Sequence, residues 1–135
     1  MAVAAARRSG EVPDRIRRGD VVISEAVWGY EYGAMEREFL PRQDWIFRPD
    51  ETLLQAAAAL PAGWQENIRV PAPRPDVAPR ATVGITASGN KVIELLGSDY
   101  VEQVSETFPG IDSVEMEGVG ALAAAELLRE QPDAP

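Results

Sequence analysis

The sequence of 135 residues contains no cysteine and no histidine. Their absence excludes disulfide bonds, thiolate nucleophiles, histidine metal ligands and every Ser-His or Cys-His catalytic mechanism. Lysine is almost absent, since Lys91 is the only one. Any catalysis must therefore rest on carboxylates, hydroxyls, arginine, backbone groups or Lys91, and we expect no metal and no cofactor. A chain without cysteine is compatible with the cytoplasm, where we expect this protein.

Long apolar runs are also missing, because none approaches the roughly 20 residues that a membrane span needs. The first residues, MAVAAARRSGEV, place their arginines after a short apolar stretch, which is the wrong order for a secretory signal. The net charge of −9 argues against nucleic acid as the main partner. A hydrophobic content of 45% and this length indicate one globular domain. From the missing apolar runs and the negative charge, we expect it to contact neither membrane nor nucleic acid.

Positive charge is concentrated in residues 1–18, which contain Arg7, Arg8, Arg15, Arg17 and Arg18. Two interpretations of this basic leader are open: a solvated and poorly ordered segment, or an arm that contacts a partner. We expect the leader over residues 1–18, a partial domain over residues 19–130 and a short tail over residues 131–135.

Strand and helix signals alternate along the domain. The β-branched run Val21 to Ile23 predicts a strand buried on both faces. RPDETLLQAAAALPAG (48–63) predicts a helix with Asp50 as its N-cap, ended by Pro61. After an exposed proline-rich connection, the pattern predicts a strand over 80–87, a helix over 99–108, a strand over 113–116 and a helix over 119–130. This order is typical of a three-layer α/β protein with a largely parallel sheet.

Three distinctive stretches each follow a predicted strand: SEAVWGYEYG (24–33), ASGNKVI (87–93) and VEMEG (114–118). In such sheets ligands bind beyond the carboxyl ends of the strands. The convergence of all three stretches at one edge indicates a ligand site more strongly than any single stretch does.

VEMEG has two interpretations. Alternation along a strand would place Glu115 and Glu117 on one side and Met116 on the other, while Gly118 allows a tight turn into the next helix. A carboxylate there can accept two hydrogen bonds from a vicinal diol, and the methionine thioether can pack on a sugar. Alternatively, the two acids only favour the dipole of the helix that follows.

The other two stretches are ambiguous in the same way. The turn at Ser88 frees backbone groups to face a planar ring, with Val92 and Ile93 packing on it, or it is a plain strand-to-helix turn. Trp28 and Tyr30 either cover an apolar ligand or partner subunit, or pack locally over the sheet edge.

Together these stretches resemble one family. GDVVISEAVWGYEYGAM, TASGNKVI and SVEMEGVGALAAA are similar, in order and spacing, to segments of bacterial 5′-methylthioadenosine/S-adenosylhomocysteine (MTA/SAH) nucleosidases. The chain thus resembles the nucleoside phosphorylase/nucleosidase superfamily over about residues 18–128. The resemblance implies an incomplete three-layer α/β/α nucleoside phosphorylase-like fold with a mixed, largely parallel sheet.

The resemblance also implies roles for the candidate residues. Glu117 would hold the ribose 2′ and 3′ hydroxyls, Met116 would pack on the ribose, and Glu115 would lie near the ribose or the nucleophile. The base would lie at the turn that begins with Ser88, flanked by Val92, where the family often has an aromatic residue, and Ile93. The loop aromatics Trp28 and Tyr30 would reach the 5′ substituent bound by a neighbouring subunit, which implies a homodimer.

The family cleaves the N-glycosidic bond of purine nucleosides, with water or phosphate as the nucleophile. Its glycine-rich first strand would precede this chain, and its "SDxAD" strand with the purine-protonating aspartate would follow the last helix. Asp133 lies in a proline-rich tail and is no credible substitute, so the catalytic residues are unassigned. We expect a fragment, a truncated reading frame or a decayed relative with little or no activity alone. The alternative is a non-catalytic nucleoside-binding or interaction module.

Overall fold

The computed structural model describes residues 16–17, 19–36, 39–42, 44–69, 76–91 and 99–130. The expected tail and most of the expected leader lie outside these ranges. Of the leader, Ile16 is buried and Arg17 bonds to Asp20. The packed part of the chain therefore begins at least as early as Ile16.

A four-stranded sheet with the order β4-β1-β5-β6 forms the centre of the molecule. Its strands are β1 (Val21–Gly29), β4 (Ile46–Phe47), β5 (Ala81–Ser88) and β6 (Ile111–Glu115). β1, β5 and β6 are parallel to one another, whereas β4 pairs antiparallel with β1. The predicted mixed, largely parallel sheet is confirmed.

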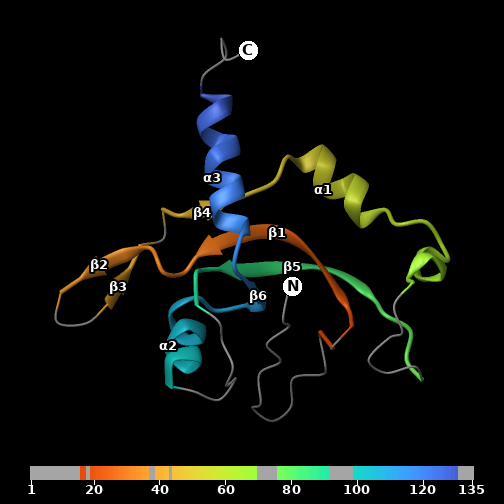
Figure 1. Ribbon diagram of the computed structural model, residues 1–135, viewed down its shortest axis with the longest axis horizontal. Helices are drawn as coiled ribbons and strands as arrows, with labels where there is room; N and C mark the ends of the chain where they lie inside the picture. The colour runs from red at the N-terminus through yellow and green to blue at the C-terminus, as the bar shows by residue number, and fades with distance from the viewer. Residues whose placement is uncertain are drawn as a thin grey trace.

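Helices cover both faces of this sheet. α1 (Glu51–Ala58) and α3 (Gly118–Arg129) lie on one side, and α2 (Asp99–Thr107) lies on the other (Figure 1). The side chain of Asp50 caps α1 by accepting hydrogen bonds from the N–H groups of Thr52 and Leu53, as predicted. The predicted α/β layers are therefore present. No helix in the described ranges is long and apolar enough to cross a membrane.

Three short strands and one 3-10 helix, η1 (Trp64–Asn67), were not predicted. β2 (Gly33–Met35) and β3 (Phe39–Pro41) form a hairpin that extends beyond one end of the sheet (Figure 1). Strands of two or three residues are too short to show a periodic pattern. Contacts between residues farther apart in the chain are found around these short strands. For example, the Tyr32 ring stacks on the Trp45 ring with their centroids 4.2 Å apart.

The expectation that the run Val21 to Ile23 is buried on both faces is wrong. Val21 is 42% exposed, whereas Ala26 is 1% and Val27 is 6% exposed. The covering groups explain this gradient, because the buried aromatic cluster and α3 pack on the carboxyl half of β1. The β-branched run predicted the strand correctly but not its environment.

The most buried cluster lies between the sheet and α2. It consists of Tyr30, Ala87 and Phe108, with partly buried apolar side chains around it. Trp28 packs on Phe108 with ring centroids 5.4 Å apart, and Tyr30 meets Tyr100 edge to face at 6.3 Å. These aromatic pairs fix α2 against the carboxyl end of the sheet.

A row of hydroxyl groups crosses the three parallel strands on the opposite face. Ser24 Oγ lies 2.6 Å from Thr86 Oγ1, which lies 2.9 Å from Ser113 Oγ. Thr86 and Ser113 are buried, so each needs this partner to offset the loss of water. The row links β1, β5 and β6 through side chains as well as through the backbone ladder.

Asp20 ties the amino ends of β1 and β5 together. Its carboxylate, 2% exposed, accepts hydrogen bonds from the backbone N–H groups of Arg17 and Arg80 and pairs with the Arg80 guanidinium at 3.1 Å. Burial alone would raise the pKa of Asp20, but these hydrogen bonds and the arginine charges outweigh it and lower that pKa. The carboxylate form thus stabilises the start of the parallel pair.

Replacing Asp20 by alanine should lower the free energy of unfolding by about 2 kcal/mol, because two backbone N–H groups lose their acceptor. The unfolded carboxyl titrates near its ordinary value of 3.8, and the folded one titrates lower. The Asp20 contribution is therefore full above that value and declines as the pH falls below it. Urea denaturation near neutral pH and at about pH 3 measures both effects. Glu106→Ala, at an exposed carboxylate of α2, is the control; equal losses for the two variants would contradict the prediction.

Candidate functional site

The three distinctive stretches meet where the parallel strands end. Gly29 at the end of β1 lies opposite Ser88 at the end of β5, and Ser88 lies opposite Glu115 at the end of β6. The side chain of Trp45 and the first turn of α3 close over Gly29, because a Cβ there would lie 3.0 Å from Val119 Cγ2. The carboxyl edge of β1, β5 and β6 is thus the site that the sequence predicts.

Glu115 bridges β6 and α3. One oxygen of its carboxylate accepts hydrogen bonds from the N–H groups of Glu117 and Gly118, each at 2.7 Å. Partial burial would raise the pKa of Glu115, but the Ser88 hydroxyl and these two N–H groups lower it below its ordinary value. Glu115 is therefore held as an ionised carboxylate that satisfies the first N–H groups of the helix.

Gly118 is required by space at this position. A Cβ built on it would lie 2.7 Å from Glu115 Oε1, so a larger residue would displace the carboxylate from the helix. Its φ is not among the positive glycine values of the described chain, so left-handed backbone is not the reason for glycine here. The chain turns from β6 into α3 at this point, and the space needed by Glu115 explains the glycine.

Glu117 and Met116 differ from Glu115 in being exposed. Met116 is 40% exposed, and Glu117 is the exposed N-cap residue of α3, whose side chain makes no capping hydrogen bond. The strand alternation that would place Glu115 and Glu117 on one side does not extend to Glu117, because β6 ends at Glu115 and the backbone then turns. Glu117 and Met116 are thus the two side chains of this stretch that are open to a ligand.

Ser88 is fully buried, and its hydroxyl accepts a hydrogen bond from the N–H of Val119 at 2.9 Å. Its side chain therefore supports α3, and a base at this turn would meet backbone groups instead. Gly89 donates its N–H to the carbonyl of Glu115 at 3.2 Å, which joins the turn to β6. Val92 and Ile93, the other candidate base contacts, lie outside the described residues.

Trp28 and Tyr30 pack within the subunit. Tyr30 is 1% exposed in the core cluster, and Trp28 is half-buried against Phe108. Burial, together with the nearby Tyr100 and Glu31, raises the pKa of Tyr30 well above its usual range, so its hydroxyl stays protonated. Of the two interpretations that the sequence left open, these contacts favour local packing over the sheet edge.

Sequence reasoning missed a polar cluster around Glu31. This carboxylate accepts hydrogen bonds from the N–H of Asn90 and from the ammonium group of Lys91, and it lies 3.4 Å from the hydroxyl of Tyr100. Partial burial would raise the pKa of Glu31, but Lys91 and Asn90 lower it. Burial and the charge of Glu31 raise the pKa of Tyr100 to about 12. The signal in the sequence was a lone lysine inside one distinctive stretch and a glutamate inside another.

The chemistry available at this edge follows from these contacts. Glu31 and Glu115 are both engaged and both have lowered pKa values, so each is ionised near neutral pH and a poor proton donor. Glu117 is an exposed carboxylate able to accept hydrogen bonds. Among the described residues, no group of three or more acidic side chains is arranged to hold a metal ion.

Comparison with known proteins places the fold. No protein-family model matches the chain, and no curated protein matches it by sequence. Solved structures do match. The MTA/SAH nucleosidase of Streptococcus pneumoniae, in complex with 8-aminoadenine, is 25% identical with a TM-score of 0.57, over 95% of this chain and 47% of that chain. A second structure from S. pneumoniae, with the transition-state inhibitor MT-ImmA, is 26% identical with a TM-score of 0.54, over 94% and 48%.

The 5′-methylthioadenosine/S-adenosylhomocysteine nucleosidase of Neisseria meningitidis, in complex with methylthio-immucillin-A, has a TM-score of 0.58. The match covers 89% of this chain and 48% of the N. meningitidis chain. At 19% identity it supports the fold alone. The likenesses to the two S. pneumoniae structures place the chain, an α/β protein, in the nucleoside phosphorylase/nucleosidase superfamily. Within that superfamily the matched structures are MTA/SAH nucleosidases, and the chain spans about half the length of each.

The two glutamates should respond differently to substitution. Glu115→Ala removes the acceptor for the first N–H groups of α3 and should lower the free energy of unfolding by about 1 kcal/mol. Glu117→Ala removes an exposed side chain and should leave stability within about 0.5 kcal/mol of wild type. Urea denaturation of both variants measures the difference. Equal destabilisation would mean that Glu115 does not hold the helix as its contacts indicate.

Proposed function

We propose that the chain binds a purine nucleoside at the carboxyl edge of β1, β5 and β6, and that its function lies in purine nucleoside N-glycosidic bond cleavage, with little or no turnover by this chain alone. One observation carries the proposal: the exposed Met116 and Glu117 directly follow the end of β6, whose last residue, Glu115, pairs with Ser88 at the end of β5. A carboxylate beside a flat apolar group suits a ribose, and a glycine turn beside it suits a planar base.

In this proposal Glu117 accepts hydrogen bonds from the 2′ and 3′ hydroxyls of the ribose, and Met116 packs on the sugar. Glu115 acts indirectly, because its carboxylate fixes the backbone of Glu117 through a 2.7 Å hydrogen bond. Backbone groups of the turn after β5 meet the base, and Val92 and Ile93 flank it. The S. pneumoniae and N. meningitidis nucleosidases were solved with 8-aminoadenine and methylthio-immucillin-A, which supports a purine-type ligand.

Cleavage requires a group that protonates the leaving purine and a nucleophile that attacks the sugar. A proton donor needs a pKa near the working pH, whereas the pKa values of Glu31 and Glu115 are both lowered. We therefore propose that this chain alone has little or no cleavage activity. Hydrolysis is favoured over phosphorolysis by the YEYG stretch, with phosphate dependence as the distinguishing measurement.

A non-catalytic nucleoside-binding or interaction module is the second candidate function. It is favoured by a separate observation, that Glu31 and Glu115, the two partly buried carboxylates at this edge, are both engaged in internal hydrogen bonds. Binding without turnover would distinguish it from an enzyme. We also propose a homodimer, in which the partly buried Trp28 keeps surface for a partner, whereas Tyr30 is buried inside the subunit. Analytical ultracentrifugation tests the dimer.

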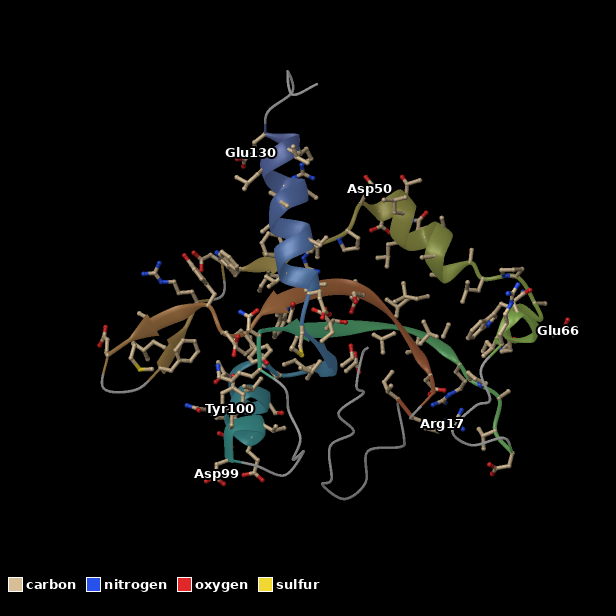
Figure 2. All side chains as sticks on the ribbon, in the orientation of Figure 1. Arg17, Asp50, Glu66, Asp99, Tyr100 and Glu130 are labelled. Atoms are coloured by element: carbon tan, nitrogen blue, oxygen red, sulfur yellow. The ribbon has the colours of Figure 1, made fainter. Side chains whose placement is uncertain are left out.

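Substituting Glu117 by alanine should weaken the binding of methylthioadenosine by about ten-fold or more, because hydrogen bonds to a charged group contribute about 1.5–3 kcal/mol. Isothermal titration calorimetry measures the change. Glu130→Ala is the matched control, since Glu130 is an exposed carboxylate at the far end of the same helix (Figure 2). Unchanged affinity in the Glu117 variant would exclude this carboxylate as the ribose contact.

Adenine release from methylthioadenosine tests the catalytic part of the proposal. The purified chain should release little or no adenine, with and without phosphate, because none of the partly buried carboxylates at the site is a suitable acid. Chromatographic detection of free adenine measures the rate. A turnover of about one per second or faster, typical of ordinary enzymes, would contradict the expected loss of activity.

A further inference from the structure

The segments YEYG (30–33) and SGNK (88–91), each part of one distinctive stretch, contact each other directly. We propose that Glu31 is a positioning residue, which holds the turn after β5 in the shape that a bound base requires. The inference rests on the proposed function, because it concerns the same site. It gives the acidic residue of YEYG a role inside its own subunit.

The contacts of Glu31 tie three segments together. One carboxylate oxygen accepts a hydrogen bond from the N–H of Asn90 at 2.5 Å, and the other receives the ammonium group of Lys91. The hydroxyl of Tyr100 on α2 lies 3.4 Å from this second oxygen. The turn after β1 is thereby joined to the turn after β5 and to the first turn of α2, on the face of the sheet opposite Glu130 (Figure 2).

The turn after β5 also packs directly on Tyr30, the residue that precedes Glu31. A Cβ built on Gly89 would stand 2.5 Å from Tyr30 Cζ and 2.8 Å from Glu31 Cγ, so only glycine allows this approach. Tyr30 itself is immobilised in the core at 1% exposure. The backbone of the turn thus packs on the Tyr30 ring and donates the Asn90 N–H to the Glu31 carboxylate.

A third contact completes the support. Gly89 donates its N–H to the carbonyl of Glu115 at 3.2 Å, so β6 holds one end of the turn while Glu31 holds the other. Lys91 lies over the Tyr100 ring, 5.2 Å from its centroid, and its charge is balanced by Glu31. Residues 88–91, the part of the turn that the structure describes, are Ser, Gly, Asn and Lys and include no apolar side chain. Its shape therefore depends on these polar contacts, and Glu31 accepts two of them.

A precisely placed backbone matters because recognition of a planar ligand by backbone groups tolerates little displacement. Removing the Glu31 carboxylate leaves the N–H of Asn90 without its acceptor and the charge of Lys91 without its partner. The turn would then sample other conformations, and affinity would fall by the fraction of molecules that lose the binding shape. Glutamine keeps one acceptor oxygen and should preserve part of the tether.

Two measurements on the full chain test the inference: amide hydrogen exchange by NMR without ligand, and calorimetry with methylthioadenosine. Glu31→Ala should raise the exchange rate of the Asn90 amide by about ten-fold or more and weaken binding by about ten-fold. Glu31→Gln should fall between the alanine variant and wild type in both measurements.

Two control variants separate positioning from general stability. Asp20→Ala destabilises the opposite end of the sheet and should leave nucleoside affinity unchanged. Glu36→Ala removes an exposed carboxylate a few residues from Glu31 and should change neither measurement. Equal weakening of binding by Asp20→Ala and Glu31→Ala would overturn the positioning role, because affinity would then follow stability alone.

The remaining outcomes are distinct. An Asn90 amide that exchanges at the same rate in wild type and Glu31→Ala would overturn the tether, whatever the ligand does. Faster exchange with unchanged affinity would overturn the role of the tether in binding. A wild-type chain that binds no nucleoside, yet protects Asn90 through Glu31, would overturn the proposed function and leave the tether as a purely structural link.

Discussion

The hydrogen bonds from two consecutive backbone N–H groups to the Glu115 carboxylate determine how the carboxyl edge of the sheet is built. They begin α3 directly at the end of β6 and leave Glu117 facing outward. Ser88 adds a second attachment by accepting the N–H of Val119. Without these buried acceptors the first turn of the helix would have unpaired N–H groups at the point where the three parallel strands meet.

Glycine positions in this edge are explained by side chains that need space. Gly118 leaves room for the Glu115 carboxylate, and Gly89 leaves room for the Tyr30 ring. Gly118 and Glu115 belong to the same stretch, whereas Gly89 makes room for Tyr30 from another stretch. The space left at Gly89 therefore links two of the distinctive stretches in three dimensions.

Much of the fold was predictable because its signals are local. A β-branched run predicted β1. Asp50 predicted the start of α1 correctly, and Pro61 predicted an end close to the observed one at Ala58. The predicted convergence of the three stretches followed from parallel topology and is confirmed by the register of Gly29, Ser88 and Glu115. That Glu115 alone would bond to the first N–H groups of α3 was not predictable, since alternation applies within a strand and β6 ends between Glu115 and Glu117. The Glu31 cluster was missed because its partners are about 60 residues away.

That sequence separation has a consequence for folding. The contacts that shape the site join residues 59 to 69 positions apart around Glu31, and the hydroxyl bond between Ser24 and Thr86 spans 62. Closing such long loops costs conformational entropy before any contact offsets it, and parallel pairing is intrinsically slow for this reason. The site should thus assemble only once β1 and β5 have paired along their length. During synthesis on the ribosome, the first turn must wait for some sixty further residues to emerge before it meets the second.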